Sequence, residues 1–143
     1  MARTQNREVS GLNLKYEARA GAVLFAEHLD RIAKFYSVVL GLTEVNRADD
    51  HILLESPGFQ LVVHRISGGG PVASDTTTPP VPRTAAAFKP VFFVPSISRV
   101  REISATYGGV TDPADRESTF RGVTVCDGHD PEGNVIQFRE RAG

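Results

Sequence analysis

The chain repeats one order of structural elements at a fixed offset, and this repeat constrains its fold more than any other feature. Two predicted helices begin at His28 and Ser96, which are 68 residues apart, and the glycines that end them, Gly41 and Gly109, are separated by the same distance. A repeat at a fixed offset indicates one structural unit used twice. The sequence therefore predicts an α+β fold of two modules, each with the order strand, helix, strand, strand, strand (βαβββ). Two unrelated pieces of similar order are the alternative.

The first copy has the hydrophobic patterns of these elements. Gly21–Ala26 is a short apolar run typical of a buried strand, and His28–Leu40 carries apolar residues spaced three and four apart, as in an amphipathic helix. Pro57 and Gly58 indicate a tight turn between the last two strands. The three strands predicted after the helix are Leu42–Arg47, His51–Ser56 and Phe59–Ile66.

The second copy follows the same order with slightly longer connections. Lys89–Val94 predicts a strand, and Ser96–Tyr107 predicts a helix with apolar residues on one side. The segment Asp130–Asn134 predicts a tight turn before the last strand. The three strands predicted after this helix are Val110–Asp112, Gly122–Cys126 and Val135–Arg139.

Composition along the chain separates the two copies. Residues 1–19 are predicted to form an N-terminal arm, because they are largely polar and lack periodicity. Residues 67–87 are rich in glycine, proline and threonine, and this composition is typical of a linker. The modules are therefore predicted at residues 20–66 and 88–143, within one structural domain overall.

The charge balance and the cysteine count exclude several classes of protein. The 143 residues carry 16 basic and 17 acidic side chains, and a nucleic-acid-binding protein normally has a basic excess. No apolar run approaches the roughly 18 residues that span a bilayer, and the polar segment 1–11 is unlike a secretory signal. A single cysteine, Cys126, excludes an internal disulfide and fits a reducing compartment. We therefore expect a cytoplasmic protein with neither a nucleic-acid nor a membrane partner.

Two motifs resemble the vicinal oxygen chelate superfamily, which includes glyoxalase I, bleomycin resistance proteins, fosfomycin resistance enzymes and ring-cleaving dioxygenases. The segment Phe35–Leu42 resembles the "FY…vLGL" helix end of that superfamily, and Asp130–Asn134 resembles its "DPEGN" turn. The resemblance covers residues 20 to 140. It implies that each βαβββ module forms a curved mixed sheet and half of a cleft, with the functional groups on the concave faces of the strands.

The resemblance also indicates where a metal would lie. Enzymes of the superfamily hold a divalent metal with His, Glu or Gln side chains from the first and fourth strands of each module. These positions correspond here to Gly21, Val62, Lys89 and Gln137. Only glutamine offers a suitable oxygen, and a lysine ammonium opposes a cation. We therefore expect no metal and no other cofactor, and a shifted site that uses His64 and Gln137 is the alternative.

Strand alternation extends this set into a predicted cleft lining, because residues two apart on a strand share a face. The lining is mostly apolar with a few polar groups, as small-molecule pockets are. Alternatively, the phenylalanines belong to the core and the cations are solvated. The predicted lining is Val23, Phe25, Val62, His64, Lys89, Val91, Phe93, Gln137 and Arg139, and the predicted ligand-binding residues among them are Phe25, His64, Lys89, Phe93, Gln137 and Arg139.

The resemblance and the residues together favour a metal-free protein that binds and sequesters a small molecule, similar to the bleomycin resistance branch. The cationic residues favour an anionic ligand and the phenylalanines an aromatic one. The resemblance implies a homodimer. No catalytic residues are predicted, because no nucleophile stands beside a suitable base. The alternatives are a metal-dependent lyase or dioxygenase with non-standard ligands, and a subunit whose cleft is vestigial and whose role is assembly.

Overall fold

The computed structural model describes residues 17–66 and 81–143. The predicted N-terminal arm at 1–19 and the predicted linker at 67–87 therefore lie mostly outside the described residues. The chain divides into two compact units, Met1–Pro71 and Val72–Gly143, and each is described by itself.

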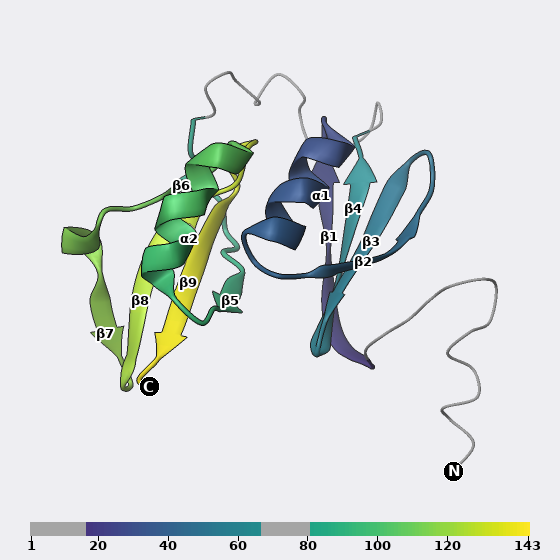
Figure 1. Ribbon diagram of the computed structural model, residues 1–143. Helices are drawn as coiled ribbons and strands as arrows, with labels where there is room; N and C mark the ends of the chain where they lie inside the picture. The colour runs from purple at the N-terminus through teal and green to yellow at the C-terminus, as the bar shows by residue number, and fades with distance from the viewer. Residues whose placement is uncertain (1–16, 67–80) are drawn as a thin grey trace, which may run out of the picture. The chain divides into compact units, whose positions relative to one another are not determined.

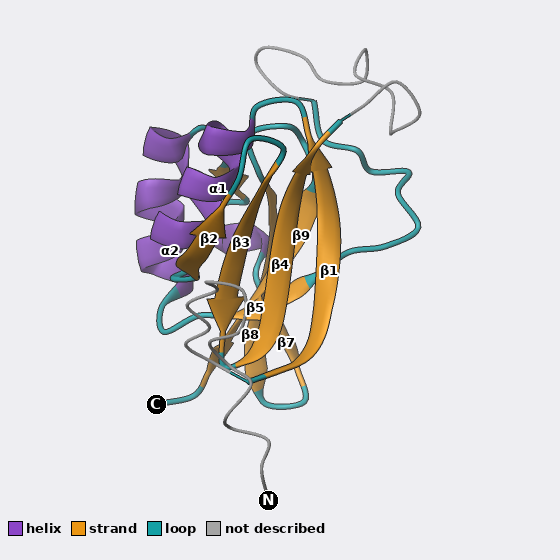
Figure 2. Ribbon diagram, turned by 90° about the vertical axis from the view of Figure 1, so that its right-hand side faces the viewer, coloured by secondary structure: helices purple, strands orange, loops and turns teal. Residues whose placement is uncertain are grey.

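The first unit is a four-stranded mixed sheet with one helix (Figure 1). The strands lie side by side in the order β1-β4-β3-β2, which Figure 2 shows face on. Strand β1 runs parallel to β4, and the other neighbours are antiparallel. The elements are β1 (Ala18–Ala26), α1 (Leu29–Val38), β2 (Thr43–Arg47), β3 (His51–Ser56) and β4 (Gly58–Arg65).

The core of this unit lies between α1 and one face of the sheet. Phe35 and Tyr36 of α1 are buried with their rings 5.3 Å apart, and Leu54 and Val63 are among the buried residues of the strands that α1 packs against. Along β4, Leu61 and Val63 are buried while their neighbours are only half-buried. This alternation leaves the other face of β4 open, as a strand with one face on the core requires.

The second unit repeats the plan and adds elements (Figure 1). Its strand order is β5-β9-β8-β6, with a further strand, β7, paired to β8. Ile136 and Phe138 of β9 are fully buried, and Ile97 and Val100 of the helix are nearly so. The elements are β5 (Val91–Phe93), α2 (Ile97–Ser104), β6 (Val110–Thr111), β7 (Ser118–Phe120), β8 (Val123–His129) and β9 (Val135–Arg141), with short 3-10 helices at Ala105–Tyr107 and Ala114–Arg116.

The predicted α+β class and the βαβββ order are confirmed, while several boundaries differ. Strand β1 begins at Ala18, within the predicted arm and before the predicted start at Gly21, and β9 continues past the predicted end at Arg139 to Arg141. The sequence missed β7, because three exposed residues carry no hydrophobic period. Strand β8 continues to His129, beyond the predicted end at Cys126. Strand β5 begins only at Val91, since Pro90 has no backbone N–H to donate to a neighbouring strand. Within the described residues, no helix is long and apolar enough to cross a membrane.

Candidate functional site

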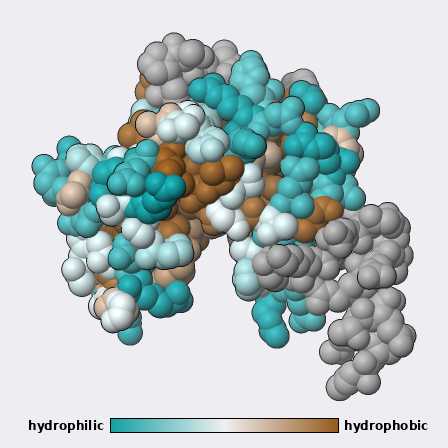
Figure 3. Space-filling model, viewed as in Figure 1, coloured by the Kyte–Doolittle hydropathy of each residue, from teal (hydrophilic) through white to brown (hydrophobic). Residues whose placement is uncertain are grey.

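The open face of the second unit's sheet gathers polar and aromatic side chains. Buried Ile136 and Phe138 alternate along β9 with Gln137, Arg139 and Arg141, which lie on the opposite face. Phe93 of β5 is 47% exposed although it is a large apolar residue. Figure 3 views the second unit from the side of α2, opposite to this face, and there too hydrophobic residues reach the surface among polar ones. Ligand-binding sites combine aromatic side chains with a few placed polar groups, and this face supplies both kinds.

A chain of polar contacts crosses this face from β5 to β9. Lys89, just before β5, places its Nζ 2.8 Å from Oδ2 of Asp127 on β8. Gln137 lies opposite Asp127 in the strand register and donates from Nε2 to its Oδ1 at 3.3 Å. Arg139 in turn donates from Nε to Oε1 of Gln137 at 2.8 Å. Three of the predicted ligand-binding residues thus lie in one network, together with an aspartate that the sequence reasoning missed.

Two arginines on the same face lie over aromatic rings. The guanidinium carbon of Arg139 is 5.1 Å from the ring centre of Phe120, and that of Arg141 is 4.0 Å from the ring centre of Phe93. Both distances allow a cation–π interaction. Phe120 and Arg141 were absent from the sequence-based lining. Phe120 belongs to the missed strand β7, and Arg141 lies beyond the predicted end of the last strand.

The residues at the superfamily's metal positions do not fit a divalent metal. A side chain at Gly21 would begin only 2.6 Å from the backbone oxygen of Gln60. The ammonium of Lys89 is already paired with Asp127, and the amide oxygen of Gln137 accepts a hydrogen bond from a guanidinium. Val62 has no donor atom. Among the described residues, no group of three or more His, Cys, Asp or Glu side chains is arranged to hold a metal.

The other two predicted ligand-binding residues, Phe25 and His64, belong to the first unit. Their ring centres are 5.9 Å apart, and His64 also stacks on His51 with the ring centres 6.1 Å apart. Asp50 accepts a hydrogen bond from Nδ1 of His51 at 2.7 Å, and this bond is the main reason that the pKa of its carboxyl is lowered. The six predicted residues therefore form two groups, one in each unit.

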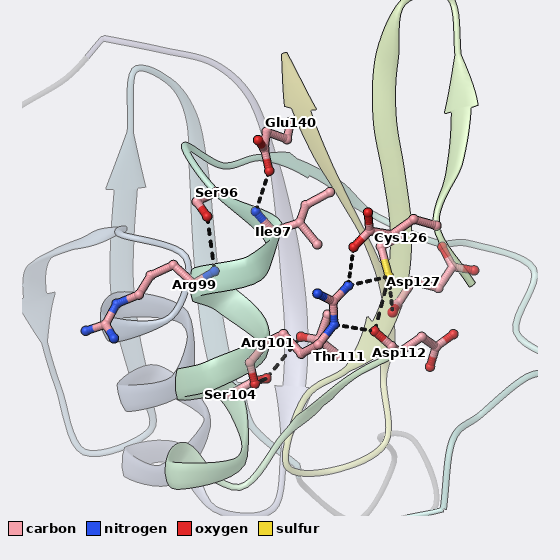
Figure 4. A network of polar contacts seen from close by, with 11 residues as sticks. Ser96, Ile97, Arg99, Arg101, Ser104, Thr111, Asp112, Cys126, Asp127 and Glu140 are labelled. Atoms are coloured by element: carbon pink, nitrogen blue, oxygen red, sulfur yellow. Dashed lines mark hydrogen bonds and ion pairs between the residues drawn. The ribbon is translucent and has the colours of Figure 1, made fainter. Parts of the chain in front are cut away.

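A second polar network braces the segment that leads to β7 (Figure 4). Arg101 of α2 donates from Nε to the backbone oxygen of Asp112 at 2.8 Å and pairs with Glu117, the residue just before β7. The hydrogen bond to Glu117 is the main cause that raises the pKa of Arg101. Glu117 directly precedes β7, so this network fixes the start of the strand that carries Phe120.

Cys126 is predicted to resist modification in the folded protein. Its side chain is 1% exposed, and burial raises the pKa of its thiol, so little reactive thiolate forms at neutral pH. We expect labelling with Ellman's reagent to be at least about 100-fold slower in buffer than in 6 M guanidinium chloride. Cys126→Ser should abolish labelling in both conditions. Rapid labelling of the folded wild type would contradict this burial.

Comparison with known proteins identifies the fold. No protein-family model matches the chain, and no curated protein matches it. Solved structures do match. A glyoxylase/bleomycin resistance protein/dioxygenase domain from Frankia sp. EAN1pec has 18% identity and a TM-score of 0.62, with 85% of this chain and 95% of that chain covered. A glyoxalase/bleomycin resistance protein/dioxygenase family enzyme from Burkholderia phytofirmans PsJN has 13% identity and a TM-score of 0.63, with 88% and 100% covered.

An integron cassette protein from the mobile metagenome of V. cholerae is also similar, with 18% identity, a TM-score of 0.59, and 88% of this chain and 95% of that chain covered. The chain therefore has the glyoxalase/bleomycin resistance fold. The resemblance to the vicinal oxygen chelate superfamily is confirmed at the level of the fold. A shared fold of this kind hosts many activities, so the function must be argued from the site.

Proposed function

We propose that this protein binds a small anionic or aromatic molecule on the open strand face of its second unit, without a divalent metal, and acts by sequestering it. The observation that carries the proposal is the contact chain from Lys89 through Asp127 and Gln137 to Arg139. At the two positions of this unit where the fold would hold a metal, this contact chain has the ammonium of Lys89 and the amide of Gln137, whose oxygen already accepts a hydrogen bond. It also leaves a cationic face beside exposed phenylalanine rings.

The same donor set argues against the metal-dependent lyase or dioxygenase alternative. Lewis-acid chemistry would need several oxygen or nitrogen ligands around one ion, usually with negative charge among them. Here Asp127 supplies the only carboxylate of the contact chain, and its charge is balanced by Lys89. The cytoplasmic location and the homodimer belong to the proposal and rest on the cysteine count and on the resemblance. Sedimentation velocity of the purified chain tests the dimer.

The proposal is tested by calorimetric titration of the purified protein with nickel, manganese and zinc, and by a thermal-shift screen of small acids and aromatic compounds. We expect no tight metal binding and a raised melting temperature with at least one acidic compound. Lys89→Ala should lower the affinity for that compound by about 5- to 10-fold, because it leaves the negative charge of Asp127 uncompensated on the binding face.

The matched control is Lys34→Ala, which removes an exposed lysine from α1 of the first unit. It should leave ligand binding unchanged. Stoichiometric, tight metal binding that is lost in Gln137→Ala would overturn the metal-free proposal. A screen in which no compound raises the melting temperature would overturn the binding proposal and favour the role in assembly.

A further inference from the structure

The two arginines of the open face differ from the other cations around them. Arg139 and Arg141 are two residues apart on β9, so their side chains leave the same face roughly 7 Å apart along the strand. Across residues 17–66 and 81–143, neither guanidinium pairs with a carboxylate, whereas Arg47, Arg99 and Arg101 each do. Among the described residues, no carboxylate balances the charge of these two arginines. They therefore give this face its net positive charge.

Lys89 is a weaker anchor for an acid than the sequence suggested. Its ammonium is 2.8 Å from Asp127, so an incoming anion at this point would meet a neutralised pair. Glu140, which lies between the two arginines in the sequence, is turned toward the helix and accepts the backbone N–H of Ile97 at 2.7 Å. It does not neutralise the arginine pair.

Each of the two guanidinium groups is backed by a phenylalanine ring. Arg141 lies over Phe93 and Arg139 over Phe120, and these rings are 47% and 50% exposed. A guanidinium is planar and offers paired donors that match a carboxylate in geometry. The exposed ring area beside it is best covered by another flat, apolar group.

We propose that the ligand is a planar aromatic carboxylate whose acid group is held by Arg139 and Arg141 and whose ring packs beside Phe93 and Phe120. This assignment of the ligand class rests on the proposed function of the same face. An inorganic phosphate satisfies the arginines but leaves both phenylalanine rings exposed to water. A neutral aromatic compound covers the rings but leaves the two positive charges unbalanced.

The test is calorimetric titration of the full chain with four probes: 2-naphthoate, cyclohexanecarboxylate, 2-naphthalenemethanol and inorganic phosphate. We expect 2-naphthoate to bind at least about 10-fold more tightly than each of the others, since it alone supplies both a carboxylate and a flat ring. Arg141→Lys and Arg139→Lys keep the charge but lose the paired donors. Each substitution should lower the affinity for 2-naphthoate by about 5- to 10-fold.

The matched control is Arg99→Lys, because Arg99 is an exposed arginine of α2 that pairs with Glu102. It should not change the affinity for 2-naphthoate. Circular dichroism and thermal melting establish that each variant is folded. Equal affinity for 2-naphthoate and cyclohexanecarboxylate would overturn the proposal that the ligand is aromatic. Tighter binding of phosphate than of 2-naphthoate would overturn the proposal that its acid group is a carboxylate.

Unchanged affinity in both lysine variants would overturn the arginine clamp. If none of the four probes binds, the ligand class is wrong. The proposed function is judged separately, by the metal titration and the broad thermal-shift screen, so the two failures are distinguishable.

Discussion

Gly133→Ala is expected to destabilise the second unit by about 3 kcal/mol. Gly133 has a φ of 83°, which L side chains rarely adopt, and an added Cβ would lie 2.2 Å from the backbone oxygen of Val81. The neighbouring backbone at Arg83 donates its N–H to the oxygen of Gly133 at 2.8 Å. Backbone atoms cannot rotate away as a flexible side chain does, so the backbone segment 81–83 must move as a whole. Urea denaturation followed by circular dichroism measures the loss.

Gly58→Ala is the matched control for this change. Gly58 has a nearly identical φ of 79°, but an added Cβ there meets nothing within 4 Å. It should therefore cost only about 1 kcal/mol, which is the strain of the left-handed conformation partly offset by the lower entropy of the unfolded chain. If the two variants lose the same stability, the contact between Gly133 and Val81 does not constrain the turn.

The fold could be predicted because its buried residues follow the periods of helices and strands. Phe35 and Tyr36 point into the core from a helix whose apolar residues recur at three and four positions, and Ile136 and Phe138 alternate along a strand. Strand β7 could not be found in this way. Its three residues are all exposed, and they are ordered by pairing with β8 and by the contact between Glu117 and Arg101.

The candidate site could be predicted only in part, for a related reason. Alternation along β9 places Gln137 and Arg139 on the open face, and it can be read from one segment of sequence. The partner of Lys89 could not be read in this way, because Asp127 lies 38 residues away and meets it only through the register of the sheet. The structure thereby changes the role of Lys89 from an anchor for the acid to a counter-ion for Asp127.

The turn at Asp130–Asn134 is one of the two motifs on which the family resemblance rests, and it has a structural role in this chain. The carboxylate of Asp130 is fully buried, and its Oδ1 accepts the backbone N–H groups of Glu132 at 2.9 Å and Asn134 at 3.0 Å. The side-chain amide of Asn134 donates to both oxygens of the same carboxylate. The glycine between them supplies the positive φ that closes the turn, and β9 with its two arginines begins directly afterwards.

Asp130→Ala should therefore cost about 3 kcal/mol of unfolding free energy, because it leaves a buried backbone N–H, a partly buried backbone N–H and a partly buried amide without their acceptor. Asp130→Asn should cost less, since one carbonyl oxygen can still accept from the two backbone groups. Asp115→Ala is the control at an exposed aspartate in the same unit, and it should stay within about 0.5 kcal/mol of the wild type. Urea denaturation ranks the three variants. An Asp130→Ala protein as stable as Asp115→Ala would mean that the backbone alone holds this turn, and that the carboxylate does not fix the start of β9.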